Sequence, residues 1–305
     1  MDYNTKTLKN NSPSKASKLA LGSAQFGSIY GVSNKPAFVS QSETCRILEL
    51  AFNSGISCID TARGYLDSES FLGKCGVSRF NIISKIPDIP DSIVDVRKWI
   101  HQEFNKTLSE LNLSRIDGLL FHNSRNLLSD NSEVIINSVK ELRNCGLVRK
   151  LGVSVYSPQE LSLIYNKFKF DLVQLPLNIF DRRFEDSGWL DTLFREGVEI
   201  HARSIFLQGL LLLPKEDIPV KFKKWSNYWD NYHDFLKKNN FNPVDLCLSY
   251  PMSLAQIKKI VVGVDSVNQL RDLIKYVNKE LVPVNSLELK CDEKLLIDAS
   301  FWDKI

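Results

Sequence analysis

Short apolar runs that alternate with amphipathic segments are the feature of this sequence that most constrains its fold. The runs are Leu19–Phe26, Ser57–Asp60, Phe80–Lys85, Ile116–His122, Lys150–Ser154, Asp171–Gln174, Val198–Arg203 and Ile260–Asp265. Between them, apolar residues recur at helical spacing, as in Glu133–Leu147 and Asn268–Asn278. Eight strands that are each followed by a helix are what a closed parallel barrel requires. The pattern therefore predicts an α/β fold of the (β/α)8 TIM-barrel class.

The order of these segments indicates one domain. The first predicted strand runs into Gly22–Gly27, which does not match the GxGxxG turn that is typical of a doubly wound sheet. No linker or shift in composition divides the chain. We expect a polar N-terminal segment over residues 1–18, the barrel over 19–280 and a C-terminal tail over 281–305. The longest interruption, Leu213–Asn242, follows the seventh strand, where barrel loops reach over the active face.

Composition and charge narrow the class of protein. The chain has 305 residues, 43% of them hydrophobic, which is enough for a large core, and a net charge of +3. Basic residues form no patch that would predict nucleic-acid binding. No apolar run is long enough to span a membrane, and the N-terminus lacks the apolar stretch of a secretory signal. We expect a cytoplasmic protein without nucleic-acid or membrane partners.

The cysteines are consistent with that compartment. They lie far apart and include no CxxC pair, so reduced, structural thiols are expected. They are Cys45, Cys58, Cys75, Cys145, Cys247 and Cys291.

Polar or ionisable residues lie at the ends of seven predicted strands. They are Asp60, Lys85, His122, Ser154, Gln174, Arg203 and Asp265. In a (β/α)8 barrel the carboxyl ends of the strands converge on one mouth, where the active site lies. One such residue is ordinary at a strand end, whereas seven together predict a site. The four histidines lie far from one another and from clustered cysteines or carboxylates, so no metal site is predicted.

The segment Asp60-Thr61-Ala62-Arg63-Gly64-Tyr65, followed by Ser68-Glu69 and Leu72-Gly73, resembles the signature of the aldo/keto reductase family. Further similarity follows in order along the chain, from about residue 19 to residue 277. It includes Leu21–Gly27, Ser84-Lys85, Phe121-His122-Asn123, Gly152-Val153-Ser154, Gln174, Asn178 and Phe206–Gly209. The resemblance implies an enzyme that transfers a hydride between NADPH, or NADH, and an aldehyde, ketone or keto-sugar.

The resemblance assigns the family's catalytic tetrad to Asp60, Tyr65, Lys85 and His122. Hydride addition to a carbonyl leaves negative charge on oxygen, and a phenol such as that of Tyr65 can protonate it. Lys85 is expected to lower the pKa of Tyr65 towards the working pH, with Asp60 holding the lysine. His122 would direct a hydrogen bond to the carbonyl oxygen.

The cofactor site is likewise implied by the resemblance. Its expected residues are Ser154, Gln174, Arg203, Ser204, Phe206, Gln208, Gly209, Gly263, Asp265, Ser266 and Gln269. Ser154 and Gln174 would bind the nicotinamide carboxamide, and Arg203 would stack on the ring in place of the usual aromatic residue. Backbone amides at the start of the last barrel helix, with Ser266, suit a phosphate.

Several residues depart from the family pattern. Gln269 stands where an arginine for the 2′-phosphate of NADPH is frequent, and Leu273 replaces an asparagine. Asp265 would repel that phosphate if its side chain pointed inwards. NADPH is the usual cofactor of the family, and these departures leave NADH open. Leu66 stands where the family usually has glycine, so a positive φ at this position would strain the turn.

Two other functions are compatible with parts of the sequence. The family includes potassium-channel β-subunits, so a regulatory or binding protein with this fold is the second interpretation. A Schiff-base enzyme that uses Lys85 is a third, and the spacing of Asp60, Tyr65 and His122 disfavours it. The physiological substrate, the direction of the reaction and the oligomeric state stay open at this level.

Overall fold

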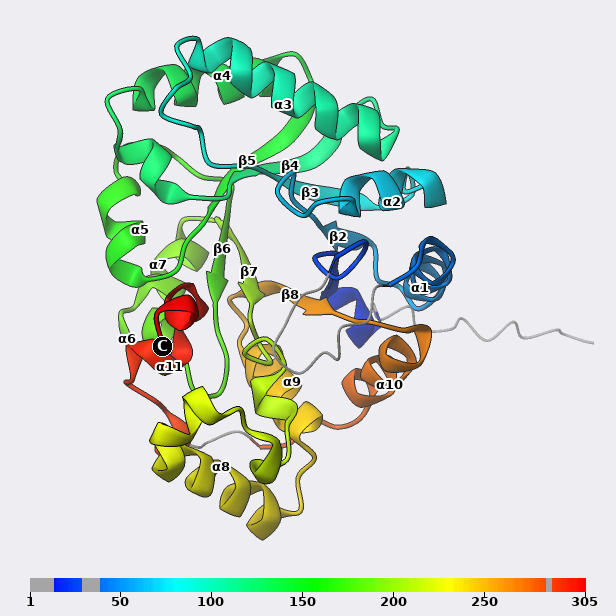
Figure 1. Ribbon diagram of the computed structural model, residues 1–305, viewed down its shortest axis with the longest axis vertical. Coiled ribbons are helices and arrows are strands. Elements are labelled where there is room, and N and C mark those ends of the chain that lie inside the picture. Colours follow the sequence, from blue (N-terminus) through cyan, green and yellow to red (C-terminus); the bar gives the residue numbers. More distant parts are fainter. Residues whose placement is uncertain (1–13, 29–38, 284–286) are drawn as a thin grey trace, which may run out of the picture.

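Eight parallel strands close a barrel in sequence order, which confirms the predicted (β/α)8 fold (Figure 1). The computed structural model describes residues 14–28, 39–283 and 287–305. Residues 1–13 of the expected N-terminal segment therefore lie outside the described residues. The strands are β1 (Leu19–Gly22), β2 (Cys58–Asp60), β3 (Asn81–Ile86), β4 (Ile116–Phe121), β5 (Val148–Ser154), β6 (Leu172–Pro176), β7 (Glu199–Arg203) and β8 (Ile257–Gly263).

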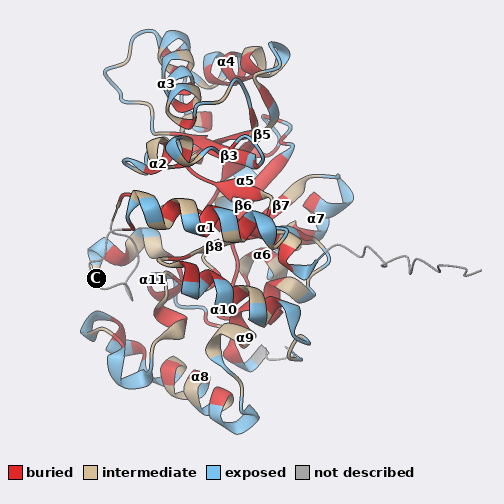
Figure 2. Cartoon of the chain, turned by 90° about the vertical axis from the view of Figure 1, so that its right-hand side faces the viewer, coloured by how far each residue is buried: buried red, intermediate tan, exposed pale blue. Residues whose placement is uncertain are grey.

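Helices surround the barrel, and most of them are buried on one face and exposed on the other (Figure 2). They are α1 (Gln41–Asn53), α2 (Ser68–Cys75), α3 (Val96–Leu111), α4 (Ser132–Asn144), α5 (Pro158–Ile164), α6 (Arg183–Asp186), α7 (Trp189–Arg195), α8 (Ser226–Asn239), α9 (Pro243–Ser253), α10 (Val267–Asn278) and α11 (Lys294–Ile297). Short 3-10 helices are η1 (Lys15–Lys18), η2 (Ser124–Leu128), η3 (Leu210–Leu212), η4 (Lys215–Asp217), η5 (Val220–Trp225), η6 (Leu287–Leu289) and η7 (Ala299–Lys304). In the described part of the chain, no helix is both long and apolar enough to cross a membrane.

The strands bury both of their faces. One cluster joins Ala20, Cys58, Ile83, Leu120 and Leu172, which come from five different strands. The side chains next to them along each strand belong instead to the core between strands and helices. Because successive side chains of a strand alternate between faces, the first cluster fills the barrel interior. This two-sided burial is why the strands read as nearly continuous apolar runs.

All eight strands differ from the prediction at one or both ends, and the largest differences are in β1 and β8. β4 ends at Phe121 and β8 at Gly263, so His122 and Asp265 lie just after these strands and not at their last residues as predicted. β1 ends at Gly22, because the next residues turn: Ser23 N–H donates to the carbonyl of Asp60, and Gly27 has a φ of 74°. The predicted strand Leu19–Phe26 was therefore too long. β8 begins at Ile257, three residues before the predicted start, because its first residues pair with β7 at Ile200.

The region after β7 and the C-terminal segment pack against each other. Trp302 lies in the core with its ring centroid 4.7 Å from that of Phe222, and its indole N–H donates to the carbonyl of Leu296 at 3.1 Å. The ammonium of Lys221 donates to the carbonyl of Trp302 at 3.0 Å. The last residues of the chain are thereby fixed beside the barrel.

One pair of cysteines contradicts the expectation of reduced thiols. Cys45 of α1 and Cys75 at the end of α2 form a disulfide across a sequence separation of 30 residues. Helices α1 and α2 lie side by side on the barrel wall, and this proximity cannot be read from the spacing of the cysteines (Figure 1). Cys58, Cys145, Cys247 and Cys291 are free, as expected.

Candidate active site

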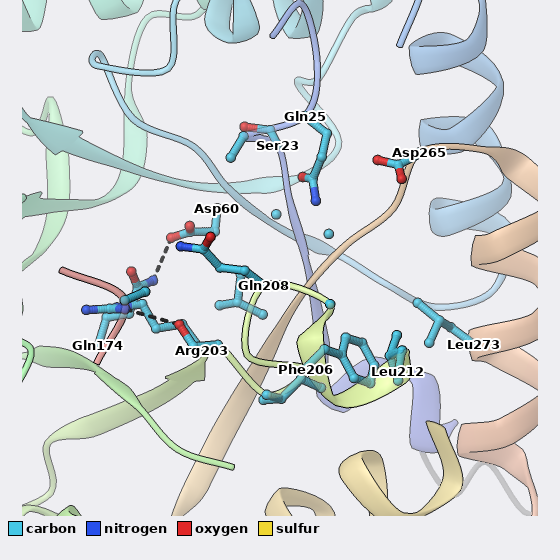
Figure 3. Close-up of a pocket in the computed structure, with 18 of the residues that line it drawn as sticks. Ser23, Gln25, Asp60, Gln174, Arg203, Phe206, Gln208, Leu212, Asp265 and Leu273 are labelled. Atoms are coloured by element: carbon cyan, nitrogen blue, oxygen red, sulfur yellow. Dashed lines mark hydrogen bonds between the residues drawn. The ribbon is translucent and has the colours of Figure 1, made fainter. Parts of the chain in front are cut away.

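A cavity of about 560 Å³ lies at the carboxyl ends of the strands. Asp60, Tyr65 and His122 line it, whereas Lys85 lies beneath them and is only 1% exposed. Every predicted cofactor residue also lines this cavity, with the exception of Ser266. Figure 3 shows Asp60, Gln174 and Arg203 at one end, and Asp265 and Leu273 at the other. The structure thus brings together nearly all the residues that the sequence predicted for one site.

The alternation of strand side chains explains why these residues meet. Asp60 lies two residues after Cys58, and Lys85 two residues after Ile83, so both share the inward face of their strands. Gln174 follows Leu172 in the same way on β6. Each of these three strands therefore continues from an interior side chain to one polar side chain at the mouth.

Lys85 and Asp60 form a buried ion pair. The ammonium donates to Asp60 Oδ2 at 2.7 Å and to the carbonyl of Thr61 at 2.8 Å. The other carboxylate oxygen of Asp60 accepts from Gln174 Nε2 at 2.7 Å. Both buried charges are therefore paired and hydrogen-bonded, as burial requires.

Tyr65 lies over this pair. Its hydroxyl is 3.5 Å from the Lys85 ammonium, and its ring meets that of His122 edge to face, with centroids 5.6 Å apart. The loop that carries it is anchored on both sides. Tyr65 N–H donates to the carbonyl of Ala62, and Ser68, which begins α2, donates to Ser23 Oγ at 2.7 Å.

Leu66 adopts a left-handed conformation, the condition under which strain was expected at this position. Its φ is 43°, in the region where glycine is favoured. The side chain is 71% exposed and does not line the cavity. Leu66 therefore strains the turn next to Tyr65 without narrowing the cavity.

Burial governs the titration of the two groups at this end. It raises the pKa of Tyr65 above its ordinary value, and the charge of Asp60 adds to the rise, while Arg203 opposes it. The expected lowering of the Tyr65 pKa towards the working pH is therefore wrong for this structure, because burial and the charge of Asp60 outweigh the attraction of nearby cations. Burial, with the charges of Lys85 and Arg203, lowers the pKa of His122 to about 4. Tyr65 is thus a protonated phenol and His122 a neutral imidazole at neutral pH.

Arg203 is held at the end of β7 by neutral partners. Its guanidinium lies over the ring of Tyr156, 4.3 Å from the centroid, and donates to the carbonyl of Val155 at 3.1 Å and to Ser204 Oγ at 3.2 Å. Sequence reasoning placed Arg203 at the mouth but did not identify Tyr156 as part of the site.

The loop after β7 follows a tightly constrained path. Ser204, Leu207 and Gln208 have positive φ values of 58°, 48° and 52°, and the amide of Asn178 donates to the carbonyl of Ser204 at 3.0 Å. Non-glycine residues with such φ values persist where the surrounding structure holds them, often at ligand sites. Ser204, Phe206, Gln208 and Gly209 line the cavity.

The far end of the cavity lies against the start of α10. Ser266 caps this helix through its Oγ, which accepts from Gln269 N–H at 3.2 Å, and Gln269 Oε1 accepts from Asp265 N–H at 2.8 Å. The arrangement resembles a capping box, except that Gln269 accepts from Asp265, the residue before the N-cap, and not from Ser266 itself. Gly263 leaves space for Gln25, whose amide nitrogen would be only 2.0 Å from a Cβ at that position.

Several residues that line the cavity were not predicted from the sequence. They are Ser23, Gln25, Tyr156, Leu212, Val244, Asp272, Tyr276, Ala299 and Ser300, among others. Most lie in loops or on helix faces, where no periodic pattern marks a residue as part of a site. Asp272 and Tyr276 offered a partial signal, since they lie one and two turns beyond Asn268 on the predicted last helix.

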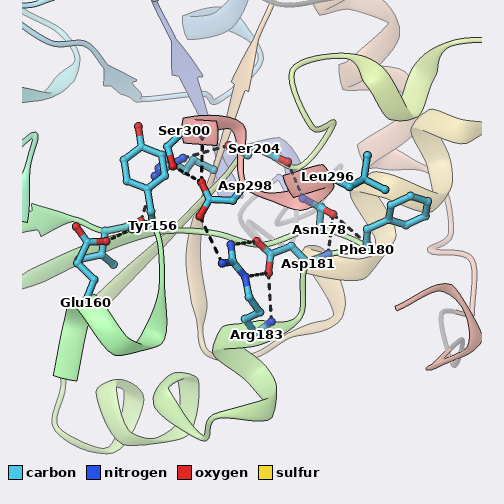
Figure 4. Close-up of polar contacts among 12 residues, drawn as sticks. Tyr156, Glu160, Asn178, Phe180, Asp181, Arg183, Ser204, Leu296, Asp298 and Ser300 are labelled. Atoms are coloured by element: carbon cyan, nitrogen blue, oxygen red, sulfur yellow. Dashed lines mark hydrogen bonds and ion pairs between the residues drawn. The ribbon is translucent and has the colours of Figure 1, made fainter. Parts of the chain in front are cut away.

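Ala299 and Ser300 reach the cavity because the C-terminal segment is anchored beside it (Figure 4). Ser300 Oγ donates to Asp298 Oδ1 at 2.7 Å, and Asp298 forms an ion pair with Arg183 at 3.4 Å. Arg183 is in turn held by Asp181 at 2.7 Å. This network fixes the chain close to Tyr156 and Ser204. Among the residues that the structure describes, no group of histidine, cysteine or carboxylate side chains is arranged to hold a metal.

Comparison with known proteins identifies relatives of this chain. The sequence model described as the aldo/keto reductase family matches residues 18–287. The uncharacterized oxidoreductase YqkF of Bacillus subtilis strain 168 is 22% identical over 191 residues, which are 60% of this chain. That match spans 61% of YqkF, which is less than two thirds of its length.

Solved structures of aldo-keto reductases share the fold. The holo form of AKR11C1 from Bacillus halodurans has a TM-score of 0.71 at 19% identity, with 89% of this chain and 90% of that chain covered. The thermostable enzyme Tm1743, in complex with the inhibitor epalrestat, has a TM-score of 0.65 at 22% identity, with 89% and 92% covered. These likenesses support the barrel architecture.

Proposed function

Because the chain belongs to the aldo/keto reductase family, we propose that it is an oxidoreductase that reduces the carbonyl group of an aldehyde, ketone or keto-sugar with a nicotinamide dinucleotide. The family and the related oxidoreductase support the reaction class. The single observation that carries the finer proposal is the contact of Lys85 with both Asp60 and Tyr65 at the closed end of the cavity.

The residues of the cavity fit such a cofactor. A volume of about 560 Å³ that runs from Tyr65 to α10 suits an extended dinucleotide, which would supply the hydride when bound. Ser154 and Gln174 would hold the nicotinamide end, because their buried polar groups border the cavity near Tyr65. Gln208 and Gly209 would lie along the middle of the cofactor.

Tyr65 is the proposed general acid. Its raised pKa keeps the hydroxyl protonated at neutral pH, so that it can donate a proton to the oxygen of the carbonyl as negative charge develops there. The Lys85 ammonium lies 3.5 Å from the hydroxyl and would attract the negative charge that is left behind, and its ion pair with Asp60 holds it in place. This state of Tyr65 favours carbonyl reduction over alcohol oxidation.

His122 is the proposed hydrogen-bond donor to the same carbonyl oxygen. Its lowered pKa makes it neutral, so one ring nitrogen carries a proton and can polarise the carbonyl without adding a full charge. Both His122 and Tyr65 line the cavity, and their rings are in contact there.

The test is replacement of Tyr65 by phenylalanine, which removes only the hydroxyl. Proton donation is worth roughly 10²–10⁴-fold in rate, so kcat should fall at least about a hundredfold in stopped-flow hydride transfer. Cofactor affinity should change little, since the hydroxyl is proposed to face the substrate. Tyr165→Phe is the matched control. The hydroxyl of Tyr165 donates to Glu196, which follows α7, and Tyr165 does not line the cavity.

Two results would decide against the proposal. If Tyr65→Phe turns over at the parent rate, the proton donor lies elsewhere. If the parent protein binds the dinucleotide but reduces no member of a broad panel of aldehydes, ketones and keto-sugars, a binding or regulatory role would replace the catalytic one.

A further inference from the structure

We infer that the substrate of this chain carries a carboxylate or phosphate group besides its carbonyl, and that Arg203 binds this anion at the mouth of the barrel. This class of substrate rests on the proposed function, because it presumes that a carbonyl is reduced beside Tyr65. Carboxylates and phosphates are both included, since each offers a pair of anionic oxygens that matches the N–H groups of a guanidinium.

Arg203 supplies the positive charge of the cavity. Among the described residues that line the cavity, it is the only lysine or arginine. Figure 3 shows it at the same end as Asp60 and Gln174. The charge of Asp60 is already matched by the Lys85 ammonium at 2.7 Å. The Tyr65 end of the cavity therefore carries a positive charge that no lining carboxylate offsets.

The guanidinium has only uncharged partners within the described part of the chain. It lies over the ring of Tyr156 and donates to the carbonyl of Val155 at 3.1 Å and to Ser204 Oγ at 3.2 Å. An arginine has five N–H donors, so these two bonds leave three of them without a partner among the described residues. Because a charge removed from water is costly unless it is paired, an anionic ligand would complete this half-buried site.

Two carboxylates of the surrounding chain are engaged elsewhere (Figure 4). Glu160 accepts from Tyr156 N–H at 2.6 Å and from the hydroxyl of Ser124. Asp298 pairs with Arg183 at 3.4 Å. Neither carboxylate lines the cavity, so a bound anion would not face them there.

Arg203 lies within electrostatic reach of the groups that would act on the carbonyl. Burial is the main cause of the raised pKa of Tyr65 and of the lowered pKa of His122, and the charge of Arg203 opposes the first shift and adds to the second. The anion and the carbonyl of one small molecule could therefore be bound at the same time. Binding of the anion would then also orient the carbonyl towards Tyr65.

This role is compatible with the expected stacking of Arg203 on the nicotinamide. A guanidinium is planar, and its N–H groups lie in that plane. One face of Arg203 is covered by Tyr156, and a ring on the other face would leave the N–H groups in the plane free for an anion. The phosphates of an extended dinucleotide would lie further along the cavity, beside Gln208 and Gly209.

The test compares aldehydes that differ in charge. The three carboxybenzaldehydes are set against the corresponding methylbenzaldehydes, and glyceraldehyde 3-phosphate is set against glyceraldehyde. We expect kcat/KM to favour the anionic member of at least one pair at least about tenfold, equivalent to about 1.4 kcal/mol. The pair that shows the preference distinguishes a carboxylate from a phosphate, and added salt should weaken it.

Variants of Arg203 assign the preference to this residue. Arg203→Tyr removes the charge but keeps a flat ring that can stack, so the anionic-to-neutral ratio of kcat/KM should fall at least about tenfold. Arg203→Lys keeps the charge without the planar group and should retain part of the preference. Arg195→Gln removes an exposed charge on α7 outside the cavity and is the control, which should leave the ratio unchanged.

Binding of the product alcohols separates this inference from the proposed function. Hydroxymethylbenzoates and methylbenzyl alcohols can be titrated calorimetrically without reaction, with or without NADPH. The parent protein should bind the benzoates more tightly, and Arg203→Tyr should remove the difference. If this preference is found but no aldehyde is reduced, the proposed function fails and the anion site stands.

Two results would overturn the inference. One is equal binding and equal turnover of the charged and neutral members of every pair. The other is a preference that survives Arg203→Tyr, and if that variant also binds the dinucleotide more weakly, Arg203 serves the cofactor alone.

Discussion

Burial changes the protonation of His122 in a way that sets the pH range of the reaction. Its pKa is lowered to about 4, because burial and the charges of Lys85 and Arg203 disfavour the imidazolium. We therefore expect the acid limb of kcat for reduction to fall near pH 4, with no inflection near the ordinary histidine value of 6.5. The proton signals of the His122 ring, followed by NMR and assigned with His122→Asn, should titrate in the same range.

The same shift affects stability with a defined sign. Between pH 6.5 and about 4 the unfolded chain binds a proton at His122 that the folded chain does not. The contribution of His122 to the free energy of unfolding is thus fully present above pH 6.5 and is lost as the pH falls through about 4. A His122 ring that titrates near 6.5 in the folded protein would contradict both expectations.

Leu66 stores backbone strain beside the proposed proton donor. A left-handed conformation costs a residue with a side chain roughly 1–2 kcal/mol, and glycine avoids this cost. Glycine also has more conformational freedom in the unfolded chain, which offsets part of the gain in stability. We expect Leu66→Gly to raise the free energy of unfolding by up to about 1 kcal/mol in urea titrations, since little buried surface is lost. Leu163→Gly, at an exposed position within α5, is the control and should lower it by a similar amount. Destabilisation by both changes would show that the turn is not strained.

At the scale of elements, the disulfide joins two helices that both lie next to residues of the candidate site. α1 carries Glu43, which contacts the start of α10, and α2 begins three residues after Tyr65. Closing a loop of this length stabilises the folded chain by about 3–4 kcal/mol through the lost freedom of the unfolded chain. We expect Cys45→Ser to lower the free energy of unfolding by about that amount, whereas Cys145→Ser, at an exposed free cysteine, should have little effect.

Titration of thiols under denaturing, non-reducing conditions checks the premise of that prediction. The structure predicts four reactive thiols for each chain, at Cys58, Cys145, Cys247 and Cys291. Six thiols in protein purified without reductant would mean that the pair is reduced in solution.

At the scale of the whole molecule, the barrel brings residues that are distant in the sequence together around one cavity. Asp60 and Gln174 are 114 residues apart but share a hydrogen bond of 2.7 Å, because β2 and β6 direct their last inward side chains to the same mouth. The region after β7 and the C-terminal segment complete the wall with Leu212, Ala299 and Ser300. The barrel supplies the polar floor, while these additions shape the rim where a substrate would enter.

Periodicity and motif were sufficient to predict the barrel and most residues of the candidate site. The strands of a closed parallel barrel are buried on both faces, so their apolar runs stand out, and each polar residue at the end of a run is a direct signal of the mouth. Asp60, Lys85 and His122 could be assigned to the mouth for this reason. Strain at Leu66 was expected only on the condition that the family's usual glycine has a positive φ there, and the structure meets that condition.

Tertiary structure alone decided the features that depend on proximity and burial. The cysteines of α1 and α2 meet because neighbouring helices pack side by side, and Glu43 reaches α10 for the same reason. The pKa of Tyr65 depends on a balance in which burial and Asp60 prevail, and residue types cannot give that balance. A sequence specifies which side chains alternate to the inside, but the charge, the solvent and the neighbours that each one meets are set only when the whole chain is folded.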